Sequence, residues 1–320
     1  MNTKYILIVL GEPYSTFSEI IGKYFAKKRI IKKKIILIGN KNLLLGQLSK
    51  LNYVLKLNEI LKIDDARRDI VNIINIEFKF KKIFDDVSKK SNNYIEKSFN
   101  TALDILKHNN NQSILINGPI SKKTYLNKKF LGITEYLANK TSTKDELMLI
   151  YNDKLSVSPI TTHVPIKYVT KKINKIKIIK HLIKINNFYK KIFNKKIYIA
   201  VLGLNPHCET VDKFSEEEKI IKPAITFLKN KGLKVNGPYP ADTFFIKKNI
   251  KKYDVVIGMY HDQVLTPLKT LYNFKAINLT IGLPFVRISP DHGPNSKMLG
   301  KNKSDPASFF YAMKFIEKIK

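Results

Sequence analysis

The stretch VVIGMYHDQ, residues 255–263, joins an apolar run to an abrupt polar end. The run VVIGMY is typical of a strand buried on both faces, and it stops at His261. The pattern recurs along the chain, with amphipathic segments of helical period in between. Strands are predicted at 5–10, 35–39, 113–117, 147–151, 197–203, 255–260 and 276–282. Helices are predicted near 17–28, 93–108, 170–195, 215–231, 241–251 and 305–319.

Apolar strands that alternate with helices predict an α/β fold with both faces of each sheet covered. A chain of 320 residues suggests two domains or one large one. In such folds ligands gather at the carboxyl ends of the strands. Polar side chains do follow the apolar segments here. They include Lys122, His163, His207, His261 and Arg287.

The net charge of +32 raises the question of nucleic-acid binding. Lysine supplies most of this charge, and lysine, isoleucine and asparagine all have A/T-rich codons. Genome composition is therefore the stronger explanation, and we expect no nucleic-acid partner. Steep salt dependence of binding would be the signature of the alternative. Among so many lysines, Arg287 in a loop rich in glycine and proline indicates a need for a guanidinium fork.

Three features of the sequence indicate the cellular compartment of the protein. No apolar run reaches the roughly 18 residues of a membrane span. The start MNTKYILIVLGEP lacks the charged region and cleavage site of a signal peptide. The one cysteine, Cys208, fits a reducing compartment. We therefore expect a cytoplasmic protein with no membrane partner.

Three of the six histidines close separate apolar segments, namely His163, His207 and His261. Three imidazoles with an open fourth position form a catalytic site for a divalent metal. A histidine at a strand end is also a common hydrogen-bonded structural residue, and the spacing alone leaves both interpretations open. His108 and His181 lie in predicted helices, where we expect structural or solvent-facing roles.

These segments together resemble one family, the 4-hydroxythreonine-4-phosphate dehydrogenases of vitamin B6 biosynthesis. The resemblance runs from about residue 113 to the end of the chain. Its main stretches are TTHVP (161–165), GLNPH (203–207), GPYPADTFF (237–245), MYHDQVLTPLK (259–269) and NLTIGLPFVRISPDHG (278–293). The resemblance implies a fold similar to the isocitrate and isopropylmalate dehydrogenases, with two α/β/α domains flanking a cleft. Residues 1–125 plus 285–320 would form the first domain with the cofactor loop, and 126–284 the second.

The resemblance also implies roles for individual residues. Those implied for the metal are His163, His207 and His261, with His261 supplied by the second subunit of a homodimer whose active site lies at the interface. Those implied for the substrate are Thr134, Lys269, Asn278 and Arg287. Asp242 and Lys122 are the candidate catalytic residues, although Asp242 could equally cap a helix. Those implied for the cofactor are His292, Gly293 and Asp305.

The implied activity is metal-dependent oxidation of 4-phosphohydroxy-L-threonine by NAD or NADP. Zinc suits three imidazoles best, with magnesium, manganese or cobalt as alternatives. Ile133 stands where the family usually has a histidine, which keeps open a sister enzyme for threonate or erythronate 4-phosphate. The loop Gly11–Thr16 lacks a second glycine of the family, which keeps open a non-catalytic protein that binds metal or phosphate. No G-x-G-x-x-G occurs, so the sequence gives no support for a Rossmann pyrophosphate site.

Overall fold

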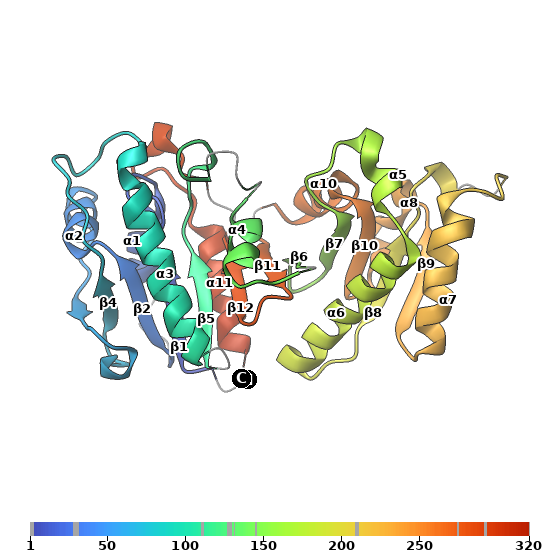
Figure 1. Cartoon of the computed structure of the whole chain (residues 1–320), viewed down its shortest axis with the longest axis horizontal. Coiled ribbons are helices and arrows are strands. Elements are labelled where there is room, and N and C mark those ends of the chain that lie inside the picture. The colour runs from blue at the N-terminus through green and yellow to red at the C-terminus, as the bar shows by residue number, and fades with distance from the viewer. Residues whose placement is uncertain are drawn as a thin grey trace. The chain divides into compact units, whose positions relative to one another are not determined.

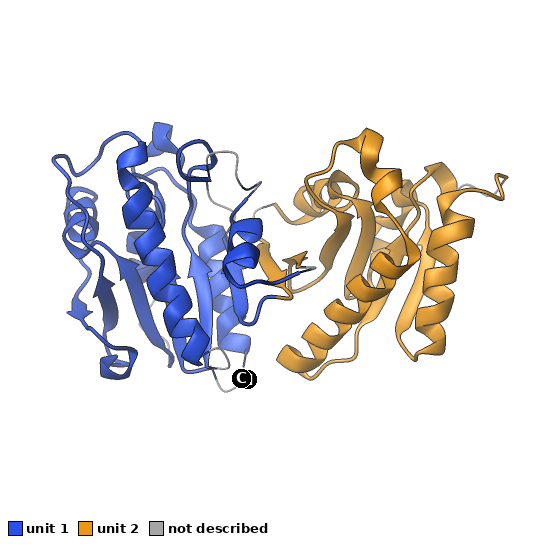
Figure 2. Ribbon diagram, viewed as in Figure 1, with its two compact units in different colours: residues 1–144, 283–320 blue, residues 145–282 orange. Residues whose placement is uncertain are grey.

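The computed structural model describes residues 3–27, 32–109, 112–126, 130, 132–144, 146–208, 211–273, 275–290 and 293–319. The chain forms two compact units (Figure 2). Unit 1 consists of Met1–Lys144 and Leu283–Lys320, and unit 2 of Asp145–Gly282. The domain borders expected from the sequence, after residues 125 and 284, stay a prediction.

Unit 1 is built on a parallel sheet with the order β3-β4-β2-β1-β5-β12. Its strands are β1 (Tyr5–Val9), β2 (Lys34–Gly39), β3 (Leu57–Glu59), β4 (Val71–Asn75), β5 (Ser113–Asn117) and β12 (Val286–Ser289). The chain adds β2 on one side of β1 and β5 on the other. The carboxyl ends of β1 and β5 are therefore the topological switch point, where ligands of such sheets bind.

Helices cover both faces of this sheet (Figure 1). They are α1 (Phe17–Lys27), α2 (Lys41–Lys50), α3 (Asn92–Asn109), α4 (Ile133–Lys140) and α11 (Ala307–Lys318). Leu7 and Val9 of β1 share a core cluster with Phe99 of α3. On the other face, Phe17 packs edge-on against Phe309 of α11, with ring centroids 5.6 Å apart. The apolar strands are thus buried from both sides, as their composition requires.

Unit 2 has a mixed sheet with the order β11-β6-β7-β10-β8-β9. Its strands are β6 (Leu147–Tyr151), β7 (Ser156–Thr161), β8 (Tyr198–Leu202), β9 (Lys234–Tyr239), β10 (Val255–Tyr260) and β11 (Ile277–Ile281). The pairs β11-β6 and β6-β7 are antiparallel, whereas β7, β10, β8 and β9 run parallel. The carboxyl ends of β7, β10 and β8 consequently meet at one edge of the sheet.

The helices of unit 2 also lie on both faces, with α6 and α7 in front of the sheet in Figure 1 and α10 behind it. They are α5 (Val169–Lys172), α6 (Lys175–Phe193), α7 (Lys222–Asn230), α8 (Ala241–Phe244), α9 (Lys247–Ile250) and α10 (His261–Tyr272). Short 3-10 or π turns complete the two units, at Ile63–Asp65, Lys89–Ser91, Lys122–Leu126, Ile166–Tyr168, Pro206–Cys208, Glu217–Ile221 and Ser296–Met298. Among the described residues, every helix is too short or too polar to cross a bilayer.

The predicted α/β architecture is confirmed, and each predicted strand occurs within one residue of its expected bounds. Two segments that were predicted to be continuous helices are each divided into two helices, so these predictions were wrong. The one at 170–195 divides into α5 and α6, because Asn174 is extended and caps α6 by accepting a hydrogen bond from the Lys177 amide. The one at 241–251 divides into α8 and α9, because Ile246 adopts an extended backbone.

Candidate functional site

Three histidines lie at the carboxyl edge of the unit 2 sheet. His163 follows β7 by two residues, His207 follows β8 by five, and His261 is the first residue of α10 directly after β10. The ring centroids of His163 and His261 are 6.2 Å apart. After β10 the chain turns at once into α10, so His261 lies directly at the end of the strand. The neighbouring strands β7 and β8 end at the same edge of the sheet.

The imidazole of His261 is oriented by its neighbour in the sequence. Its Nδ1 lies 2.7 Å from Oδ1 of Asp262, which makes Nδ1–H the donor to a carboxylate. The second ring nitrogen, Nε2, then carries a lone pair that is available to a ligand. A carboxylate that fixes the tautomer of a histidine in this way is the usual outer partner of a metal ligand.

His207 sits in a strained loop. Its backbone has φ of 55°, and the next residue, Cys208, has φ of 63°. Non-glycine residues adopt this left-handed region at a cost and are concentrated at functional sites. The side chain is 84% exposed, with Nδ1 3.9 Å from Oδ2 of Asp242. Asp242 lies inside the first turn of α8, whose N-cap is Pro240, so the helix-cap interpretation of Asp242 was wrong.

The donor chemistry of this edge fits a divalent transition metal, since three imidazoles are accompanied by the carboxylates of Asp242 and Asp262. Within the described part of one chain, however, no three His, Cys, Asp or Glu side chains come close enough together to hold an ion. Within one chain, the imidazoles of His163 and His261 lie close to each other, whereas the imidazole of His207 lies close to Asp242.

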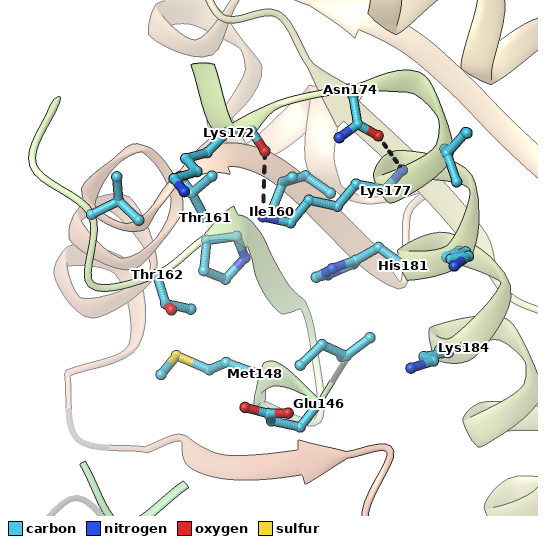
Figure 3. Close-up of a pocket in the computed structure, with 15 residues that line it drawn as sticks. Glu146, Met148, Ile160, Thr161, Thr162, Lys172, Asn174, Lys177, His181 and Lys184 are labelled. Atoms are coloured by element: carbon cyan, nitrogen blue, oxygen red, sulfur yellow. Dashed lines mark hydrogen bonds between the residues drawn. The ribbon is translucent and has the colours of Figure 1, made fainter. Parts of the chain in front are cut away.

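A cavity of about 420 Å³ adjoins the His163 loop, and Thr162 and Val164 on either side of that histidine line it (Figure 3). Its charged lining consists of one acid, Glu146, and four lysines, Lys172, Lys177, Lys180 and Lys184. His181 lies in the wall with its Nε2 2.7 Å from the Ser158 hydroxyl. Burial, reinforced by the charges of Lys177 and Lys184, lowers the pKa of His181 to about 3. The positive potential of the cavity favours anions.

Two predicted substrate residues of unit 2 lie away from the histidine edge of their own chain. Lys269 is exposed on α10, eight residues beyond His261, which is about 12 Å of helix rise. Asn278 pairs with Ile150, which in turn pairs with Val157, about 13 Å along β7 from Thr161. The Oδ1 atom of Asn278 is buried and accepts no hydrogen bond from the described residues.

The predicted substrate residues Thr134 and Arg287 do come together, in unit 1. Arg287 on β12 is 1% exposed. Its Nε donates to Oδ1 of Asn117 at 2.8 Å, and its Nη1 donates to Oγ1 of Thr134 at 2.8 Å. Burial lowers the pKa of Arg287 to about 10, and Glu135 opposes this effect. Asn117, at the carboxyl end of β5, thus orients the guanidinium, a role that the sequence did not indicate.

Of the predicted cofactor residues, Gly293 lies near the switch point of unit 1, Asp305 lies before α11, and His292 falls outside the described residues. Pro294, next to the exposed Gly293, accepts a hydrogen bond from the Thr16 amide at 3.1 Å, so the loops after β12 and β1 meet. Asp305 accepts from the Ala307 amide at 2.9 Å and so stabilises the start of α11. Lys122 is exposed in the turn that follows β5.

The loop Gly11–Thr16 is shaped by close backbone contacts. Gly11 has φ of 73°, and a Cβ there would overlap the carbonyl oxygen of Pro119. Glu12 is 1% exposed, and its carboxylate accepts a hydrogen bond from the Ser91 hydroxyl at 3.3 Å. Burial raises the pKa of Glu12 to about 7, partly offset by this bond and by the Tyr14 amide. Gly-Glu-Pro at a strand end was the only sequence signal for this buried acid.

Comparisons of the sequence and of the structure with known proteins find relatives of one family. The sequence model described as "Pyridoxal phosphate biosynthetic protein PdxA" matches residues 31–316. The 4-hydroxythreonine-4-phosphate dehydrogenase of Sulfurihydrogenibium sp. (strain YO3AOP1) is 37% identical over 96% of each chain. The D-threonate 4-phosphate dehydrogenase of Salmonella typhimurium is 30% identical over 95% of this chain and 96% of its own. A solved putative 4-hydroxythreonine-4-phosphate dehydrogenase from Salmonella typhimurium superposes with a TM-score of 0.86 at 28% identity, covering 99% of this chain and 100% of its own.

Proposed function

The chain belongs to the PdxA family of pyridoxal phosphate biosynthetic proteins and is a dehydrogenase, and we propose that it oxidises 4-phosphohydroxy-L-threonine with NAD or NADP. The product would be a β-keto acid, which loses carbon dioxide because its carbonyl accepts the electrons and gives 3-amino-2-oxopropyl phosphate. The observation that carries the proposal is the set of three histidines at one sheet edge in a member of this family. The name of the 37% identical relative supports the choice of substrate.

In this proposal His163, His207 and His261 hold a divalent ion, zinc being the best match, with magnesium, manganese or cobalt as alternatives. Such an ion would lower the pKa of the substrate hydroxyl, so that its proton leaves at neutral pH. Asp262 keeps Nε2 of His261 available by accepting from Nδ1. Asp242 and Lys122 are the proposed proton-transfer residues, a carboxylate and an ammonium with complementary roles.

The remaining polar residues would bind and orient the ligands. Thr134, Lys269, Asn278 and Arg287 are the proposed substrate contacts, which offer the donors that a phosphate needs. His292, Gly293 and Asp305 are the proposed cofactor contacts. When bound, the nicotinamide supplies the hydride acceptor. We further propose a cytoplasmic homodimer with its active site at the interface, in which His261 comes from the second subunit.

A second candidate is oxidation of D-threonate 4-phosphate or erythronate 4-phosphate. The Salmonella relative named for D-threonate 4-phosphate supports it. Ile133 also supports this second candidate. It is adjacent to Thr134, a proposed substrate contact, and its side chain neither donates nor accepts a hydrogen bond.

The proposed function is tested by treating the purified protein with a chelator and assaying reduction of NAD and NADP with 4-phosphohydroxy-L-threonine. We expect no reduction until zinc or magnesium is restored, and 3-amino-2-oxopropyl phosphate as the product by mass spectrometry. Full activity in the chelated protein would contradict the metal role. A different product would contradict the assigned reaction.

A further inference from the structure

The cavity beside the His163 loop has the size of a small-molecule site. Its volume is about 420 Å³, and sites for small molecules commonly measure about 300–1,000 Å³. Its wall is partly apolar, with Met148 of β6, Ile160 of β7 and Ile176 of α6. Every described residue that lines it belongs to unit 2. None of these residues is among those proposed above for the metal, the substrate or the cofactor, so the proposed reaction gives the cavity no role.

Positive charge predominates around this cavity. Among the described residues of its wall, Glu146 is the one acid, and the bases are Lys172, Lys177, Lys180 and Lys184. Figure 3 shows Lys172 and Lys177 at the top of the view and Glu146 at the bottom. Nζ of Lys177 donates to the carbonyl of Lys172 at 3.4 Å, which holds this ammonium at the wall. The cavity therefore has a potential that attracts anions.

The N-terminal end of α6 lies at the same cavity. Asn174, which caps this helix, lines the cavity together with Ile176 and Lys177 of the first turn. The helix has 19 residues, and the aligned peptide dipoles of a helix place about half a positive charge at its N-terminus. Backbone amides at such an end are suited to phosphate groups. The helix end and the lysine side chains are thus two sources of positive potential at one place.

His181 adds a polar group to the wall but no charge. The Ser158 hydroxyl donates to the Met148 carbonyl, so the Ser158 oxygen accepts from Nε2–H of His181 at 2.7 Å. Burial, reinforced by the charges of Lys177 and Lys184, lowers the pKa of His181 to about 3, which keeps the imidazole neutral at physiological pH. The positive charge that an anion meets in the cavity is therefore carried by the lysines and the helix end, and not by the imidazole.

We propose that this cavity binds a small organic phosphate. The phosphate group lies between Lys177 and the first turn of α6, and the organic part lies against Met148 and Ile160. Lysine binds phosphate as a point charge, and the apolar wall favours a ligand with an organic part over a hydrated inorganic ion. This binding site goes beyond the proposed oxidation and does not depend on it.

The test is isothermal titration calorimetry of the full chain with phenyl phosphate as the probe. The unsubstituted protein should bind it with a dissociation constant on the order of 1 mM or lower. Lys177→Gln/Lys180→Gln should weaken this affinity about 10-fold, since it removes two charges at the cavity. The matched control is Lys190→Gln/Lys191→Gln, which removes two exposed charges of the same helix outside the cavity. No binding to the unsubstituted protein, or equal affinities of the two double variants, would overturn the proposal.

Two further titrations test where the probe binds and what the cavity recognises. Arg287→Lys, which alters the phosphate contact proposed in unit 1, should bind phenyl phosphate as tightly as the unsubstituted protein. An affinity weakened by Arg287→Lys but not by Lys177→Gln/Lys180→Gln would place the phosphate in unit 1 and overturn the proposal. Inorganic phosphate should bind more weakly than phenyl phosphate, because it cannot use the apolar wall, and equal affinities would overturn the assignment of an organic ligand. These titrations need no turnover, so a failure of the proposed oxidation and a failure of this site are distinguishable.

Discussion

Replacing Glu12 by glutamine should make the protein more stable at neutral and alkaline pH. The carboxyl of Glu12 is buried, and burial raises its pKa from 4.5 to about 7. Between these two values the folded state binds more protons than the unfolded state, so stability falls as the pH rises. A pKa shift of this size contributes about 3 kcal/mol to the free energy of unfolding. This contribution is present below pH 4.5 and is lost by about pH 7. Glutamine has no proton to release and so avoids this loss.

The assay is urea unfolding of Glu12→Gln and of the unsubstituted protein, over a pH range from about 4.5 to about 8. The stability of the variant relative to the unsubstituted protein should increase by about 3 kcal/mol across that range. Any unmet hydrogen bond of the new amide adds an offset that is independent of pH. Glu59→Gln, which removes an exposed carboxylate paired with Lys41, controls for the general loss of charge. A stability difference that stays flat with pH, or matches that of Glu59→Gln, would show that Glu12 does not titrate with a raised pKa in the folded protein.

Three further predictions concern the site. His207→Ala should abolish metal-dependent turnover while leaving the fold intact, and turnover at the unsubstituted rate would exclude His207 as a ligand. Arg287→Lys should raise the KM for the phosphorylated substrate and lower stability by on the order of 2 kcal/mol, because an ammonium cannot replace both bonds to Asn117 and Thr134; an unchanged KM would count against the substrate contact. Equal mixing of inactive His207→Ala and His261→Ala subunits should restore about a quarter of the activity if His261 acts across a homodimer interface. No restoration would place all three ligands in one chain.

The strands were predictable because they are long apolar runs, and a sheet covered on both faces requires such runs. Strand β7 has the sequence SVSPIT, in which polar residues interrupt the run. It is nevertheless buried, because Ser158 bonds to His181 and Ser156 accepts from the Tyr189 hydroxyl. These partners lie on α6, far along the chain, so local sequence could not identify the strand.

Helix α10 was missed for a local reason. It begins at His261 without a side-chain cap from Tyr260, and it contains Pro267. The usual signals for a helix start and interior are therefore absent, and packing against β7 and β10 stabilises the helix instead. Contacts among side chains were equally invisible to the sequence. The bond of Gln263 to Gly203 depends on β10 lying beside β8, which only the sheet order reveals.

The histidines, in contrast, could be found from the sequence, because each follows an apolar segment that ends at one sheet edge. The distances between the histidines could not be predicted from the sequence. The structure pairs His163 with His261 and leaves His207 beside Asp242. Arg287 was singled out by its rarity in a lysine-rich chain, yet its burial between Asn117 and Thr134 depends on the register of β12 against β5.

The proposed substrate is tested most directly by the rate of NADH or NADPH formation by metal-loaded protein with 4-phosphohydroxy-L-threonine, compared with D-threonate 4-phosphate under the same conditions. We expect metal-dependent reduction with the first substrate and a higher kcat/KM for it than for the second. Turnover of D-threonate 4-phosphate alone, by folded and metal-loaded protein, would contradict the proposed substrate.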